Sequence, residues 1–202
     1  MKSQTKILLP NGYLSWSQLN LFTHSPERYR KVYVLRERGF TNSAMEYGKK
    51  LADALDIGDN GEDPLITAIR ILLPKYSVIE KEIKVKYKDL IFLGKLDSYD
   101  PPTHNIYEYK TGKVKWTQRR VDKHQQLDFY AMLVYLKYKK IPKVKLIWAE
   151  TEEVDGEISA TGNIQEFTRK IKLKDILIMI SKASRISKEI SKMYREEIKK
   201  IF

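Results

Sequence analysis

Hydrophobic and polar positions divide the 202-residue chain into stretches with two different periods. Up to about residue 73, apolar residues recur every three or four positions, which is typical of amphipathic helices. Serine or aspartate caps and the prolines at 26 and 64 indicate where such helices begin. Four helices are therefore expected, in SWSQLNLF (15–22), SPERYRKVYVLR (25–36), SAMEYGKKLADALD (43–56) and PLITAIRILL (64–73).

From residue 77 the apolar residues alternate with polar ones, which predicts strands. Three strands are expected in SVIEKEIKVKY (77–87), LIFLGKLDSY (90–99) and NIYEYKTG (105–112), the last two joined by the turn DPPTH. A helix is then predicted over 118–140, followed by two strands around VDGE, in KVKLIWAETEE (143–153) and GNIQEFTRKIKL (162–173). A final amphipathic helix is predicted over 174–201, with an apolar stripe formed by Ile176, Leu177, Ile180, Ala183, Ile190 and Ile201.

This order of elements favours an α/β fold with a central mixed β-sheet flanked by α-helices. A chain of this length is expected to form one domain, residues 1–202. Its parts are a helical N-terminal region (14–73), a core (77–170) and the C-terminal helix (174–201). We expect that helix to pack on its own domain, and its alternative use is a contact between copies in a homo-oligomer.

The net charge of the chain indicates what kind of partner it binds. The chain holds 38 Lys and Arg against 26 Asp and Glu, a formal net charge of +12. Such an excess favours a polyanionic partner, while the alternative is simply a lysine-rich surface. The longest apolar runs are too short for a signal peptide or a membrane span, so we expect a soluble, cytoplasmic protein.

The residue types restrict any metal site. The chain has no cysteine and only three histidines, well separated in sequence. Thiolate-bound zinc and an iron–sulfur cluster are therefore excluded, and any metal must be held mainly by oxygen. Oxygen ligands favour Mg²⁺ or Mn²⁺.

Candidate ligands stand in the second and third predicted strands. Glu108 and Lys110 are two residues apart and leave the same face of their strand, while Tyr109 leaves the other. The short turn brings Asp97 beside Glu108. Two carboxylates can hold a divalent metal that polarises a phosphate oxygen and activates water, and a lysine can orient that water or stabilise charge. In a chain with one-third charged residues, however, such a pattern also arises by chance.

Neighbouring residues make the pattern more specific. Gly94 precedes the aspartate in GKLD, Thr-Gly follows the lysine in YEYKTGK, and Gln126 and Tyr130 share one helix face in HQQLDFYAMLVY. Together with LSWSQLNLFTHSPERY near the N-terminus, these segments resemble the PD-(D/E)XK nuclease superfamily. The resemblance covers residues 14 to about 135. Within the superfamily, the chain is most similar to the RecB-like exonuclease branch, which includes CRISPR-associated RecB-like and AddB-type nucleases.

The resemblance implies a restriction-endonuclease-like core and a role for each matching residue. Asp97, Glu108 and Lys110 match the catalytic set, with the metal held by Asp97 and Glu108. Glu46 is similar to an acidic residue that the superfamily often supplies as a further ligand. Gln126 and Tyr130 match a Gln-x-x-x-Tyr motif that lies beside the site and contributes to handling DNA.

Three positions depart from the family pattern. Leu96 replaces the proline of the superfamily's name, as in many members. Ala52 replaces a histidine that is normally a metal ligand in RecB-like enzymes. Either one metal is enough for activity, or Glu46 or Asp53 takes the place of the missing ligand. Ser25 replaces the cysteine found before the proline in members with an iron–sulfur cluster, which agrees with a cluster-free protein.

A basic segment follows the catalytic strand. Its side chains are expected to contact phosphates of the substrate, and the residues are Lys113, Lys115, Trp116, Arg119 and Arg120. Trp116 has two interpretations, stacking on a base or closing the core. No phosphate-binding loop of an ATPase is present in the sequence.

These observations predict a Mg²⁺- or Mn²⁺-dependent DNA nuclease, an exonuclease in recombination, repair or virus replication. A compact chain without helicase motifs resembles small phage or archaeal-virus nucleases, which would act in the host cytoplasm. One alternative is a Holliday-junction resolvase or structure-specific endonuclease. Another is a non-catalytic nucleic-acid-binding protein that retains the fold.

Overall fold

The structure is a computed structural model that describes residues 6–37, 43–57 and 64–201. Within this part of the chain, five strands form one sheet in the order β1-β2-β3-β4-β5. The strands are β1 (Val78–Tyr87), β2 (Leu90–Asp100), β3 (Asn105–Gly112), β4 (Val144–Val154) and β5 (Glu157–Arg169). β3 and β4 run parallel and the other neighbours antiparallel, so the predicted mixed sheet is confirmed.

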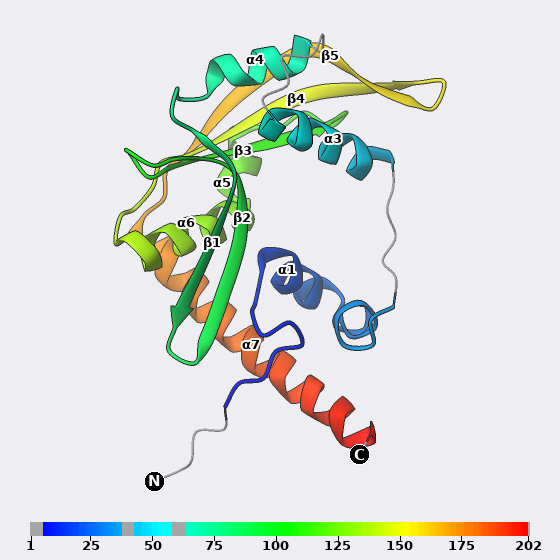
Figure 1. Cartoon of the computed structure of the whole chain (residues 1–202), viewed down its shortest axis with the longest axis vertical. Coiled ribbons are helices and arrows are strands. Elements are labelled where there is room, and N and C mark those ends of the chain that lie inside the picture. Colours follow the sequence, from blue (N-terminus) through cyan, green and yellow to red (C-terminus); the bar gives the residue numbers. More distant parts are fainter. Residues whose placement is uncertain (1–5, 38–42, 58–63, 202) are drawn as a thin grey trace.

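Helices surround this sheet (Figure 1). They are α1 (Trp16–His24), α2 (Pro26–Tyr29), the π-helix η1 (Arg30–Val34), α3 (Ser43–Ile57), α4 (Pro64–Leu72), α5 (Gln118–Asp122), α6 (Gln125–Tyr138) and α7 (Leu173–Ile201). The hydroxyl of Ser15 caps α1 and that of Ser25 caps α2, where Pro26 takes the first position. These two helix starts are as predicted. Among the described residues, no helix is both long and apolar enough to cross a membrane.

Side chains that alternate along the central strands belong to two hydrophobic cores, one on each face of the sheet. Ile106 of β3 and Leu146 and Trp148 of β4 belong to the larger core, with residues of α1, α6 and α7. Tyr107 and Tyr109 of β3 belong to the smaller core, with residues of α3 and α4. The sheet therefore lies between two helical layers, and α3 and α4 are seen together beside β4 and β5 in Figure 1.

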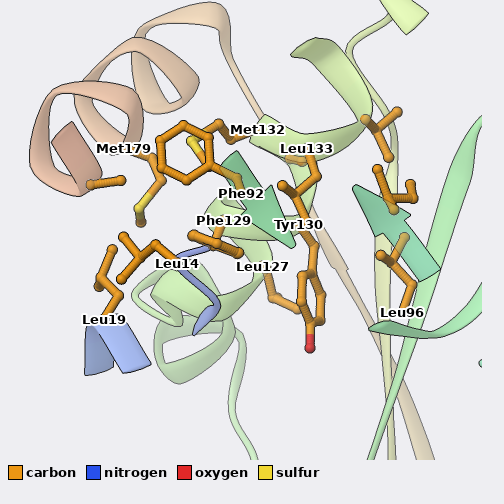
Figure 2. Close-up of a cluster of buried hydrophobic side chains, with 14 of the residues drawn as sticks. Leu14, Leu19, Phe92, Leu96, Leu127, Phe129, Tyr130, Met132, Leu133 and Met179 are labelled. Atoms are coloured by element: carbon orange, nitrogen blue, oxygen red, sulfur yellow. The ribbon is translucent and has the colours of Figure 1, made fainter. Parts of the chain in front are cut away.

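Helix α6 connects the parallel strands β3 and β4 and packs closely on β2 within the larger core (Figure 2). The contact is closest at Gly94. A Cβ atom added there would lie 2.5 Å from Cδ1 of Leu133 and 3.2 Å from Cε1 of Tyr130. The glycine of the GKLD segment therefore allows the helix to approach the strand that carries Asp97.

Four details differ from the sequence prediction. The single helix predicted over 118–140 is wrong, because the chain breaks at Lys123 and His124 into α5 and α6. No glycine or proline marks this break, and tertiary packing of His124 against Trp116 accompanies it. The helix predicted over 25–36 changes to a π-helix after Tyr29.

The other two differences concern later elements. Strand β5 begins at Glu157 and ends at Arg169, earlier than the predicted strand. Leu177 was expected inside the stripe of α7 but is 53% exposed, whereas Ile176, Ile180, Ala183 and Ile190 are buried. The side chain of Ile201 lies outside the described residues.

Candidate functional site

The ladder between β2 and β3 opens where the two predicted carboxylates face each other. The paired residues are Ser98 with Tyr107, Tyr99 with Ile106, and Asp100 with Asn105. The next pair in this register would be Asp97 and Glu108. Instead of backbone pairing, Oδ2 of Asp97 accepts a hydrogen bond of 2.8 Å from the backbone N–H of Tyr109. The side chain of Asp97 thus occupies the opening between the strands.

Glu108 and Lys110 leave the same face of β3, as expected. Glu108 is fully buried, and its Oε1 lies 2.6 Å from Nζ of Lys110. Its second oxygen, Oε2, is buried without a hydrogen-bond partner among the described residues. A buried carboxylate oxygen without a donor is costly, and either a proton shared with the neighbouring Asp97 or a bound cation would stabilise it.

Burial and mutual repulsion perturb this group of side chains. Burial, and then the charge of Asp97, raises the pKa of Glu108 to about 8. Burial likewise raises the pKa of Asp97, although Lys110 acts in the opposite direction. Burial alone would lower the pKa of Lys110, but the carboxylates of Glu108 and Asp97 raise it. Two carboxylates this close therefore need a further positive charge before both ionise easily.

A divalent cation fits these observations. Oδ2 of Asp97 already accepts a hydrogen bond from the backbone, which fixes the side chain in place. Oε2 of Glu108 is free to bind, and both donors are hard oxygens suited to Mg²⁺ or Mn²⁺. The two side chains supply the donors, and water or a phosphate would complete the coordination.

Gln126 and Tyr130 lie on α6, and His124 is the residue just before its first turn. Nε2 of Gln126 donates to the hydroxyl of Tyr130 at 3.0 Å, and Oε1 of Gln126 lies 3.2 Å from Nε2 of His124. Burial, followed by the charges of Glu108 and Asp97, raises the pKa of Tyr130 well above its ordinary value of 10. Burial and the nearby cation of Lys110 lower the pKa of His124 to about 4, so the ring is neutral at pH 7.

A surface groove of about 660 Å³ leads to Lys110. One wall is formed by α1, and the other by the residues around the α5–α6 break, with Lys182 of α7. The charged side chains on these walls are Lys110, Arg120, Lys123 and Lys182, and the described lining contains no carboxylate. We call this feature the basic groove, and its charge suits a chain of phosphates.

Trp116 supports one of these cations. The ring is 6% exposed, and the guanidinium carbon of Arg120 lies 4.0 Å from its centroid. The ring of His124 packs against the same ring in a T-shaped arrangement, with centroids 4.9 Å apart. Trp116 therefore holds Arg120 at the groove by a cation–π contact and has little ring surface left for a base.

Other residues predicted for the site lie neither at the carboxylate pair nor in the lining of the basic groove. Glu46 lies exposed in the first turn of α3. No group of three His, Asp or Glu side chains in the described residues could hold a metal. Lys113 pairs with Glu153 at 3.0 Å, and Lys115 and Arg119 are exposed outside the groove lining. The side chain of Ala52 lies outside the described residues.

The structure adds residues that sequence reasoning missed. Trp16, Asn20, Thr23 and His24 of α1 line the groove, and so does Lys182 of α7, which lies 44 residues beyond the end of α6 at Tyr138. The polar pair Asn20 and Thr23, three residues apart on one face of α1, was the available signal. Nothing in the pattern of α7 distinguished Lys182 from its other lysines.

Comparison with known proteins shows the fold. A proposed exonuclease from Eubacterium rectale matches with a TM-score of 0.55 and 13% identity, over 89% of this chain and 82% of that chain. The alkaline exonuclease LHK-Exo from Laribacter hongkongensis matches with a TM-score of 0.53 and 12% identity, over 94% and 93%. A phage-related exonuclease from Haemophilus somnus matches with a TM-score of 0.50 and 10% identity, over 90% and 81%.

Comparisons with models of protein families and with curated sequences give no match. The similarity to solved structures is thus a similarity of fold. Any function must be argued from the side chains of the site.

Proposed function

We propose that this protein is a metal-dependent nuclease that hydrolyses phosphodiester bonds in DNA, acting as an exonuclease. The observation that carries the proposal is the buried Oε2 of Glu108. This atom has no partner among the described residues, lies at the ladder opening beside Asp97, and shares its side chain with an ion pair to Lys110. In a purely structural ion pair, a buried oxygen without a donor would only reduce the stability of the folded protein.

Asp97 and Glu108 would hold Mg²⁺ or Mn²⁺. Such an ion, when bound, polarises a phosphate oxygen and lowers the pKa of a coordinated water molecule. The neighbouring carboxylates keep Lys110 protonated, so its ammonium can donate to a phosphate oxygen or orient the attacking water. Glu46 remains a proposed additional ligand on the strength of the family resemblance.

The basic groove would bind the DNA backbone. Arg120, Lys123 and Lys182 present cations along its walls, and Lys110 connects these to the carboxylates. Charge of this kind supplies affinity without sequence specificity. Lys113, Lys115 and Arg119 lie exposed near the groove and would contact phosphates further along the strand.

The exonuclease assignment is supported by the fold that the chain shares with solved exonucleases, one of them described as phage-related. Membership of the RecB-like branch and a role in recombination, repair or virus replication are parts of the proposal. The motifs around Asp97, Glu108 and Gln126 support them.

Cleavage assays test the proposal. End-labelled linear DNA, single- and double-stranded, would be incubated beside closed circular DNA with Mg²⁺, Mn²⁺ or EDTA. We expect metal-dependent loss of linear DNA alone, abolished in Asp97→Ala and Lys110→Ala. Cutting of closed circles would instead indicate an endonuclease such as a junction resolvase. Binding without cleavage in either metal would show a non-catalytic nucleic-acid-binding protein.

A further inference from the structure

Three side chains form a hydrogen-bonded row between the basic groove and the carboxylates. Nε2 of His124 lies 3.2 Å from Oε1 of Gln126, and Nε2 of Gln126 lies 3.0 Å from the hydroxyl of Tyr130. His124 and Gln126 line the groove, whereas Tyr130 is 7% exposed. The row thus runs from the groove toward the interior.

The orientation of the Gln126 amide in the structure sets the direction of both hydrogen bonds in this row. The nitrogen of Gln126 can only donate, so the oxygen of Tyr130 accepts. The oxygen of Gln126 can only accept, so Nε2 of His124 must carry the hydrogen. Because the ring is neutral at pH 7, its other nitrogen is unprotonated. His124 is therefore in the Nε2–H tautomer.

This direction leaves the hydroxyl hydrogen of Tyr130 unused within the row. The hydroxyl points away from the apolar side chains that surround the ring (Figure 2). The charges of Glu108 and Asp97 act on it and raise its pKa, and the group stays protonated at neutral pH. Tyr130 therefore keeps a hydroxyl hydrogen that it can donate to a group outside the row.

We infer that His124 is a positioning residue, which holds the amide of Gln126 in the orientation that leaves the hydroxyl hydrogen of Tyr130 available to the substrate phosphate. This inference rests on the proposed nuclease function. Without a donor at position 124, the amide can rotate by 180° and its oxygen can accept the hydrogen of Tyr130. The donor would then be withdrawn from the reacting group.

The surroundings of His124 suit such a role. Its ring is held edge-on against Trp116, whose centroid lies 4.9 Å away. The break between α5 and α6 occurs at this residue, which has extended backbone angles. The ring is thus fixed by packing rather than free on the surface.

Two variants separate this role from a packing role. His124→Gln removes the ring but retains a side-chain N–H donor, and His124→Leu removes both. We expect His124→Leu to lower kcat on the order of tenfold with little change in KM, since the donor acts on the reacting phosphate. His124→Gln should stay within about threefold of the wild type. Equal loss in both variants would overturn the inference.

A double-mutant cycle provides the second readout. Tyr130→Phe removes the hydroxyl, so adding His124→Leu to it should cause no further loss of kcat. Losses that multiply would show that His124 acts independently of Tyr130. Thermal unfolding of each variant identifies any loss that comes from misfolding.

Nitrogen-15 NMR of the metal-free protein tests the hydrogen-bond direction without any cleavage. Only three histidines are present, so His24→Gln and His104→Gln variants assign the signals. We expect the neutral Nε2–H tautomer of His124 at pH 7. A Nδ1–H tautomer or an imidazolium would contradict the inference. If the wild type cleaves no DNA, the proposed function fails, while this measurement still decides whether His124 orients Gln126.

Discussion

The carboxylate of Asp97 accepts the backbone hydrogen bond of Tyr109 at 2.8 Å, in the place where β2 and β3 cease to pair. This contact means that Asp97 has a structural role and a proposed metal-binding role in the same side chain. One oxygen accepts from a backbone donor, and in the proposed metal site the carboxylate would also bind the ion.

The two roles can be separated by comparing Asp97→Asn with Asp97→Ala. We expect both to lower cleavage by at least about 1,000-fold, because a metal-bound carboxylate supplies several kcal/mol. Asparagine keeps an oxygen for the Tyr109 N–H, whereas alanine does not. Asp97→Asn should therefore be more stable than Asp97→Ala by about 1–3 kcal/mol in urea unfolding. DNA binding should be retained in both, and equal stabilities would show that the backbone contact contributes little.

Stability of the metal-free protein should depend on pH through Glu108. Its pKa is raised to about 8 in the folded state, against about 4.3 in an unfolded chain. Between these values the folded state binds more protons than the unfolded state, so the free energy of unfolding falls as pH rises. We expect the Tm in EDTA to decrease from pH 5 to pH 8.

Mg²⁺ should restore this stability, and more strongly at pH 8 than at pH 5, because it binds the ionised carboxylates. Glu108→Gln is the matched control, since it cannot ionise. Its Tm should change less with pH and should not respond to Mg²⁺. An unchanged pH slope in Glu108→Gln would show that other groups cause the effect.

Two glycines should respond to alanine with opposite signs. At Gly94 the added Cβ would lie 2.5 Å from Leu133 and 3.2 Å from the ring of Tyr130, within a buried contact. We expect Gly94→Ala to destabilise the protein by about 1–3 kcal/mol. At Gly48 in α3 the nearest atom is Oγ1 of Thr111 at 3.9 Å, an ordinary contact.

Gly48→Ala should therefore stabilise the protein by about 0.5–1 kcal/mol, the usual gain from alanine in a helix. Chemical unfolding of the two variants beside the wild type measures both changes. Loss of stability in Gly48→Ala would indicate a closer approach between α3 and β3 than the structure shows.

Arg120 and Arg119 are neighbours on α5 with different surroundings. Arg120 is held over Trp116 in the basic groove, whereas Arg119 is exposed outside its lining. We expect Arg120→Ala to weaken DNA binding at every sequence and to lower the slope of log K against log[salt] by about one. Arg119→Ala should have a smaller effect, and titrations at several salt concentrations compare the two.

Trp116→Leu extends this comparison. Without the ring, the guanidinium of Arg120 loses its cation–π support, so binding should weaken in the same direction as in Arg120→Ala. If Trp116 instead stacked on a base, the loss in Trp116→Leu would add to that in Arg120→Ala. A double variant distinguishes these outcomes.

Much of the site could be inferred from local patterns. Period-two alternation places Glu108 and Lys110 on one face of a strand whatever the rest of the chain does. Strand β3 was predicted with its observed bounds, and the short DPPTH turn required β2 to lie beside it. The absence of cysteine restricted the metal donors to oxygen, because composition alone decides which ligands exist.

Other features have no signal in the local pattern. The break between α5 and α6 has no local signal, and it presents His124 to Trp116 and Gln126. The walls of the basic groove come from α1, α5, α6 and α7, and only packing around a shared core brings Trp16 and Lys182 to the same place.

The chemistry of this protein was thus determined by the sequence, and its geometry by the tertiary structure. Spacing along one strand decides which residues share a face, since backbone geometry repeats every two residues. Whether the ladder opens at Asp97, whether Oε2 of Glu108 keeps a partner, and which cations face Lys110 depend on how the sheet twists and the helices pack. The Asp97 contact joins two strands at residues 12 apart, the groove joins Trp16 to Lys182, and the pattern within a single element carries no record of either.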